Sequence, residues 1–176
     1  MNSLEERFEI WMQQADLPNE NINNSNNKKM LEYFKNYIEG LSIYEVKLDD
    51  YVGMLKFSLE NKIHLYFIQD QKTIIGLVCF DKYNGGRIGL VHGGCLFYTL
   101  FLCVTILMDK AYPLKDRKYY EKYTENITTN YKNLVPINTI HMIRVAMENE
   151  DIIGEILNHQ QKICVKIHLK FIKPKL

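Results

Sequence analysis

The stretch GLVHGGCLFYTLFLCVTILM, at residues 89–108, decides the fold that this sequence predicts. It opens with glycines around His92 and continues as an apolar run that ends before Asp109. The run is long enough for about four helical turns. Because it is apolar on nearly every side, it must be buried all round or lie in a membrane. It is shorter than a bilayer span of roughly 20 residues and contains threonines and cysteines, so we expect a helix wrapped by a soluble domain.

Length and composition narrow the class of protein. A chain of 176 residues fits one domain with an appendage, and a hydrophobic content of 47% is enough for a full core. The net charge of +1 gives no overall attraction to nucleic acid or to a membrane, so neither is expected as a partner. The four cysteines lack CxxC spacing and are typical of reduced thiols in an intracellular protein, rather than of a disulfide or a metal site.

The N-terminal sequence carries Glu5 and Glu6 before its first basic residue, Arg7. A secretory signal would begin with basic residues, and a transit peptide would be poor in acids. The expected location is therefore intracellular, with the cytoplasm and the mitochondrion both open.

The part before residue 60 is expected to be a helical extension. Capping-box spacing at Ser3 and Glu6, followed by apolar residues at helical intervals, predicts a helix within residues 1–18. It is expected to pack on its own domain, with a partner-binding helix as the alternative. Residues 19–27 are dominated by asparagine and are interpreted as a linker. Residues 28–59 resume a helical pattern, with Gly40 as a stop signal, although residues 41–61 are ambiguous.

Residues 60–176 are expected to form the main domain. Strand patterns occur at residues 63–68 and 73–80, joined by a polar turn, and again after the apolar run at residues 124–131, 139–147, 152–157 and 162–172. The last of these alternates apolar with largely basic residues, which predicts one buried face. Helices and strands do not alternate regularly, which argues against a parallel doubly wound sheet. We expect an α+β domain whose antiparallel sheet curls around the long buried helix.

Two motifs together resemble the hotdog-fold thioesterase superfamily, in particular its acyl-CoA thioesterase branch. The first is GLVHGG at residues 89–94, placed before a long apolar helix, and the second is TENITTNYK at residues 124–132, which leads to Pro136. The resemblance covers roughly residues 60–174. It implies a hotdog fold, a homodimer or homotetramer with active sites between subunits, and an acyl-CoA thioester as substrate. Coenzyme A enters as part of that substrate, and no separate cofactor is implied.

The resemblance places the reaction at the N-terminal end of the central helix. A thioester carbonyl develops negative charge when water attacks it, and backbone N–H groups at a helix N-terminus stabilise such charge. Gly93 and Gly94 are suited to present them, because no side chain blocks the approach. By the same resemblance, His92 orients the loop and the carbonyl; the alternative is a histidine that only bonds a neighbouring loop. Thr124 falls where the family often carries a Ser or Thr that positions the water or the carboxylate, and is otherwise an ordinary strand threonine.

Basic residues near these motifs are candidates for binding the phosphates of coenzyme A. They are Lys132, Arg117 and Lys118, and each alone is otherwise a solvated surface charge. No metal site is expected, because the remaining histidines lack metal-ligand spacing; these are His64, His141, His159 and His168.

The sequence departs from the family pattern at the catalytic acid. These thioesterases usually carry Asp or Glu nine residues after the histidine, where this chain has Phe101, and some carry Asn or Gln six residues before it, where this chain has Gly86. Asn84 is the nearest substitute for the amide. Asp109 lies about 12 Å beyond Phe101 along a helix, which is too far for it to act at the N-terminal end of that helix. Glu121, in the loop after the helix, is therefore kept as a weak candidate for the acid. Losing a positioned base costs on the order of 10²–10⁴ in rate.

Two functions therefore remain open: an acyl-CoA thioester hydrolase, and a catalytically impaired acyl-CoA-binding or scaffolding protein. A third, a dehydratase of the hotdog type, has no matching motif. Cys95 offers a different nucleophile, since a thiolate is favoured at the start of a helix. The alternative is that Cys95 is a small buried residue on the core face.

Overall fold

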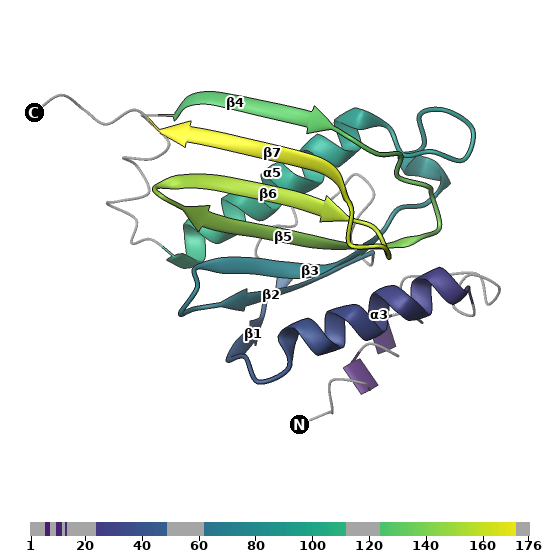
Figure 1. The fold of residues 1–176 in the computed structure, drawn as a ribbon, viewed down its shortest axis with the longest axis horizontal. Coiled ribbons are helices and arrows are strands. Elements are labelled where there is room, and N and C mark those ends of the chain that lie inside the picture. Colours follow the sequence, from purple (N-terminus) through teal and green to yellow (C-terminus); the bar gives the residue numbers. More distant parts are fainter. Residues whose placement is uncertain are drawn as a thin grey trace, which may run out of the picture.

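The computed structural model describes residues 6–7, 10–11, 13, 24–48, 62–111 and 124–171. The described residues between 6 and 13 are helical. The other elements, in chain order, are α3 (Ser25–Ile38), β1 (Ile43–Glu45), β2 (Ile63–Ile68), β3 (Thr73–Cys79), the 3-10 turn η2 (Lys82–Asn84), α5 (Gly93–Ala111), β4 (Thr124–Tyr131), β5 (Ile140–Glu148), β6 (Asp151–Leu157) and β7 (Ile163–Phe171) (Figure 1).

One antiparallel sheet of seven strands carries the fold, in the order β1-β2-β3-β5-β6-β7-β4. Helix α5 lies against one face of this sheet, and α3 lies against the other (Figure 1). The sequence prediction of an antiparallel sheet around a long central helix, with a helical N-terminal extension, is confirmed. The three-residue strand β1 was not predicted, because it falls in the ambiguous segment after Gly40.

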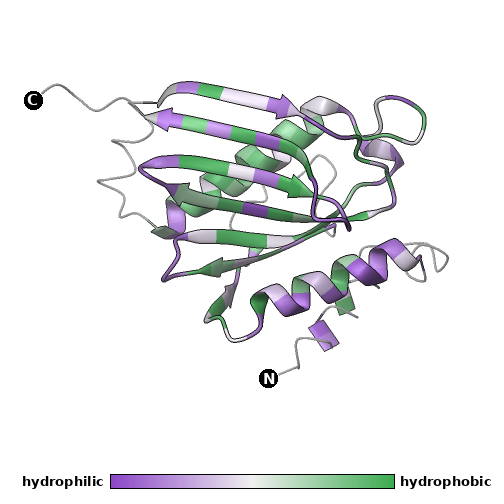
Figure 2. Ribbon diagram, viewed as in Figure 1, coloured by the Kyte–Doolittle hydropathy of each residue, from purple (hydrophilic) through white to green (hydrophobic). Residues whose placement is uncertain are grey.

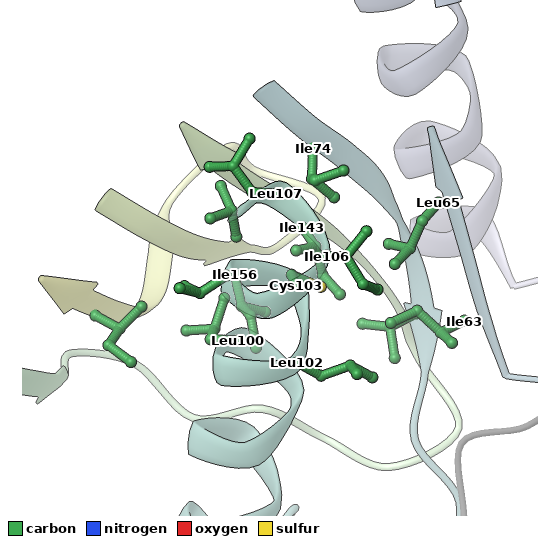
Figure 3. Close-up of a cluster of buried hydrophobic side chains, with 14 of the residues drawn as sticks. Ile63, Leu65, Ile74, Leu100, Leu102, Cys103, Ile106, Leu107, Ile143 and Ile156 are labelled. Atoms are coloured by element: carbon green, nitrogen blue, oxygen red, sulfur yellow. The ribbon is translucent and has the colours of Figure 1, made fainter. Parts of the chain in front are cut away.

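The main core lies between α5 and the sheet. Leu100, Cys103 and Leu107, at helical spacing on α5, are fully buried there. Alternate residues of the strands face them, including Ile74 and Ile143, as the two-residue period of a strand requires (Figure 3). By length and composition α5 is apolar enough to cross a membrane, and half of its most apolar 18-residue window is buried in the fold.

Helix α3 builds a second core on the opposite face of the sheet. Its buried residues Met30, Phe34 and Ile38 pack over β2, β3 and β5, while its other side is hydrophilic (Figure 2). The helix begins at Ser25, inside the asparagine-rich segment interpreted as a linker. Two side chains explain that start: the Asn24 carboxamide accepts a hydrogen bond from the Asn26 amide, and Asn27 Oδ1 accepts one from the Ile140 amide at 2.9 Å.

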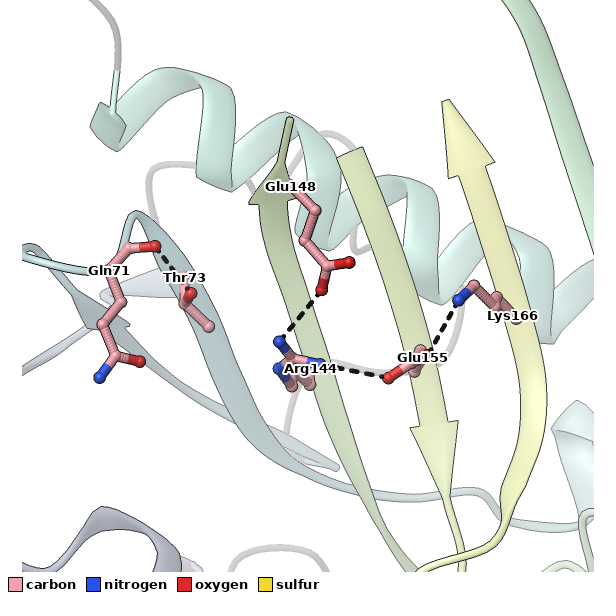
Figure 4. Close-up of polar contacts among 6 residues, drawn as sticks. All are labelled: Gln71, Thr73, Arg144, Glu148, Glu155 and Lys166. Carbon is pink, nitrogen blue, oxygen red and sulfur yellow. Dashed lines mark hydrogen bonds and ion pairs between the residues drawn. The ribbon is translucent and has the colours of Figure 1, made fainter. Parts of the chain in front are cut away.

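Charged side chains cover the same face beyond α3. Arg144 on β5 and Lys166 on β7 both contact the buried Glu155 of β6, at 3.5 and 3.4 Å, and Arg144 also contacts Glu148 at 3.1 Å (Figure 4). The short turn before β3 is held by the Thr73 hydroxyl, which donates to the Gln71 carbonyl at 3.0 Å (Figure 4). The basic face predicted for the last strand is thus partly neutralised by its neighbour.

Candidate functional site

The segment between β3 and the start of α5 is held by hydrogen bonds within itself and to the loop that follows β4. Within it, η2 is closed by a capping box between Asp81 and Asn84. The His92 amide then donates to the Asn84 carbonyl at 2.8 Å, and the Val91 amide donates to the Val135 carbonyl at 2.9 Å. These bonds fix His92 directly before the first residue of α5.

The imidazole of His92 caps the helix that follows it. The Gly94 amide donates to His92 Nδ1 at 3.0 Å. In the neutral ring, an accepting Nδ1 requires the proton to be on Nε2, so Nε2 carries an N–H donor. A Cβ on Gly94 would lie 3.1 Å from Nδ1, which explains why glycine stands at this position.

Tyr131, at the end of β4, holds the first residue of the helix. Its hydroxyl donates to the Gly93 carbonyl at 2.9 Å, and its ring would lie 3.3 Å from a Cβ on Gly93. The Gly93 carbonyl and the Gly94 N–H belong to one peptide unit. Tyr131 and His92 therefore occupy both polar groups of that unit and fix its orientation.

One N–H group is left over at this helix end. The first four N–H groups of a helix have no partner within it along the regular pattern. Here Gly94 donates to His92 Nδ1, and Cys95 and Leu96 both donate to the His92 carbonyl. In the part of the chain that the structure describes, the Gly93 N–H has no hydrogen-bond partner. The N-terminal end of α5 thus carries the Gly93 N–H as an available donor with the helix dipole behind it, and the His92 Nε2–H is a second donor on the residue before it.

This arrangement refines what the sequence predicted for the two glycines. Both were expected to present N–H groups to the carbonyl, whereas in the structure the Gly94 N–H is taken by His92. The contact from Tyr131 was not predicted. The Asn-Tyr-Lys strand end had been noted only as part of the family resemblance, and the hydrogen bond joins residues 38 positions apart.

The expected acid position holds an aromatic pair. Phe101 is half-buried against the core and stacks on Phe97, with ring centroids 5.9 Å apart and planes 15° from parallel. The sequence of α5 contains one acid, Asp109, which lies about 24 Å from Gly93 along the axis. Helix α5 therefore supplies no carboxylate near its N-terminal end.

The other predicted site residues do not all lie near Gly93. Lys132 is exposed directly after Tyr131. Thr124 begins β4 at the strand end opposite Tyr131, about 23 Å away along the strand, so one chain alone does not bring it to Gly93. The loop candidates lie outside the described residues; they are Arg117, Lys118 and Glu121.

Two further candidates, Cys95 and Asn84, lie beside His92, and contacts within the protein involve both side chains. Burial raises the pKa of the Cys95 thiol, an effect that hydrogen bonds from Thr99 and Asn84 only partly oppose. The environment thus favours the thiol and argues against a Cys95 thiolate nucleophile. The buried Asn84 side chain accepts from the Asp81 amide at 3.0 Å as part of the capping box. Among the described residues, no group of three His, Cys, Asp or Glu side chains could hold a metal ion.

Comparison with solved structures identifies the fold. The chain is similar to a thioesterase superfamily protein, with 16% identity, a TM-score of 0.53, and coverage of 86% of this chain and 80% of the other. It is also similar to zebrafish thioesterase superfamily member 2, with 10% identity, a TM-score of 0.53, and coverage of 78% and 91%. A hypothetical thioesterase protein from Streptococcus pneumoniae, solved with coenzyme A, shows 12% identity, a TM-score of 0.50, and coverage of 61% and 84%.

These likenesses confirm the predicted hotdog fold, which the chain shares with thioesterase superfamily proteins. Searches of protein-family models and of curated proteins gave no match to the sequence.

Proposed function

We propose that the chain is an acyl-CoA thioester hydrolase that polarises the thioester carbonyl at the N-terminal end of α5. The observation that carries this proposal is the Gly93 N–H, which is left without a partner among the described residues at a helix end fixed by His92 and Tyr131. The shared fold of thioesterase superfamily proteins and the presence of coenzyme A in one such structure support it.

The chemistry follows from these donors. The carbonyl oxygen accepts hydrogen bonds from the Gly93 N–H and the His92 Nε2–H, and both strengthen as negative charge develops there. A water oxygen forms a bond to the carbonyl carbon, and the carbon–sulfur bond then breaks. The acid product leaves with the water oxygen, and a proton from that water reaches the departing thiolate. With Phe101 on the helix, the attacking water has no carboxylate base from α5, so turnover is slow.

A homodimer would complete the site. Strand β4 is an edge strand of eight residues, and such an edge offers unpaired backbone groups to a second strand. Exposed apolar side chains accompany it, with exposed fractions of 39% for Ile127, 54% for Tyr131 and 36% for Tyr98. A second copy paired at β4 covers these side chains and offers its Thr124 a route to the Gly93 end. Lys132, with Arg117 and Lys118, is proposed to bind the coenzyme A phosphates.

The second candidate is an acyl-CoA-binding or scaffolding protein without turnover. The aromatic pair of Phe97 and Phe101 favours it, because an apolar surface replaces the acid while the carbonyl donors remain. The two candidates share a ligand and differ in chemistry.

One pair of measurements separates them. Purified protein in excess over acyl-CoA is assayed for single-turnover thiol release, and calorimetry measures binding of a ketone analogue that keeps the carbonyl but lacks the scissile bond. Thiol release above the uncatalysed rate supports the hydrolase. Binding without release supports the second candidate, and a folded protein that does neither contradicts both.

A further inference from the structure

A polar cluster lies on the face of the sheet opposite the candidate site, at β1 and β2. His64 Nε2 is 2.7 Å from the Tyr66 hydroxyl and 3.7 Å from Glu45 Oε1. Arg7 Nη1 donates to Glu45 Oε2 at 3.4 Å. The cluster therefore joins the N-terminal helical segment to the first two strands.

Trp11 covers this cluster from the same helical segment. Arg7 and Trp11 are both helical residues and reach one surface, Arg7 through Glu45 and Trp11 through His64. The Trp11 side chain is only 3% exposed, and its ring centroid lies 6.2 Å from that of His64. Arg7 also has a side-chain hydrogen bond to Tyr66, whose hydroxyl contacts His64, so a charge on His64 bears directly on both groups that hold Arg7.

The surroundings of His64 oppose its protonation. Burial is the largest effect and lowers the pKa of His64 from its usual 6.5. The Glu45 carboxylate raises that pKa by less, and the Arg7 guanidinium lowers it. Burial also raises the pKa of Tyr66 to about 12, so the phenol stays neutral beside the imidazole. The residue paired with His64 on β3, Leu77, carries no charge, and Lys62, two residues before His64, is itself paired with Asp81.

We propose that Arg7 and Trp11 form an N-terminal clasp on the sheet, and that proton binding at His64 releases it. The clasp is a conformational device separate from the thioester chemistry, since it lies on the opposite face of the sheet. A released clasp exposes the ring surfaces of Trp11 and His64 together.

The sign of the pH dependence follows from proton linkage. The clasped state, in which His64 is buried, binds the proton more weakly than a hydrated open state, for which the usual histidine pKa of 6.5 is the reference. The clasp is therefore at full strength above that pH and weakens as the pH falls below it. A single proton changes the ratio of open to clasped molecules by at most about tenfold per pH unit.

The single tryptophan of the chain makes the clasp observable in the full-length protein. Acrylamide quenching and the emission maximum of Trp11 are measured between pH 8 and pH 5, while far-UV circular dichroism monitors the fold. We expect Trp11 to become more accessible below about pH 6.5, with secondary structure retained. His64→Phe, which keeps a ring in the site, should keep Trp11 buried across the whole range.

A second variant and a matched control keep the test decisive. His64→Gln retains a hydrogen-bonding group for Tyr66 and serves if the phenylalanine variant does not fold. His168→Gln removes another histidine of the same sheet face, paired with Asp151, and should leave the transition unchanged. A Trp11 accessibility that is constant with pH, or an identical transition in both His64 variants, would overturn the proposal.

Discussion

Replacing Gly93 by proline removes the N–H that the proposed mechanism depends on and little else. Gly93 is the first residue of α5, where proline is well tolerated because its missing N–H has no helical partner. A Cβ there would meet the Tyr131 ring at 3.3 Å, and that ring is 54% exposed and free to move slightly. The helix and the fold are therefore expected to persist in Gly93→Pro.

The expected loss of rate follows from the role of a single donor. Deleting one preorganised N–H donor to an oxyanion typically costs 10²–10³ in rate, or about 3–4 kcal/mol of barrier. Gly93→Ala is the matched control, because it introduces the same Cβ contact with Tyr131 but keeps the N–H. Its rate should stay close to that of the unmodified chain.

Single-turnover thiol release from acyl-CoA, with enzyme in excess, measures both variants without interference from product release. Thermal unfolding and circular dichroism verify that each is folded. Equal rates for the proline and alanine variants would refute the assignment of Gly93 as the carbonyl donor. Equal losses in both would point to the Tyr131 contact instead.

Three other perturbations test separate parts of the structure. Phe101→Asp should raise thiol release by about 10²–10⁴ relative to Phe101→Asn, which has no base. The lost stack on Phe97 should lower the unfolding free energy of both variants by about 1 kcal/mol. Tyr131→Phe should lower thiol release by about tenfold, because the Gly93 carbonyl loses its donor, with an unfolding free energy reduced by about 1 kcal/mol or less. Burial lowers the pKa of His141 to about 4, so the unfolding free energy should fall by about 3 kcal/mol as the pH drops from about 6.5 to 4. Urea titrations check this, and a loss of the same size in His141→Gln would contradict it.

The strands and the central helix were predictable because their signals are local. The strand patterns predicted at residues 63–68 and 124–131 match β2 and β4 residue for residue. The start of α3 was predicted too late, and one of its two causes is distant: besides the local Asn24 cap, the buried Asn27 side chain receives a hydrogen bond from Ile140, 113 residues away. β1 was missed because three residues are too few to show a period.

The start of the central helix was predictable, but the hydrogen bonds at that helix end were not. The glycines around His92 and the apolar run after them indicated a functional helix end. Which N–H remains available depends on the rotamer of His92 and on Tyr131, whose contact with Gly93 spans 38 residues. No pattern of residue types encodes that distinction between Gly93 and Gly94.

The proposed mechanism depends on the Gly93 N–H receiving the thioester carbonyl. The chain has nine glycines, so protein labelled with ¹⁵N at glycine alone gives a sparse amide spectrum, and Gly93→Ala identifies one signal in it. On addition of the ketone analogue of acyl-CoA, the Gly93 amide proton is expected to move downfield, while the amide of Gly40, beyond the end of α3, stays in place. Binding of the analogue with no change at Gly93 would contradict the account.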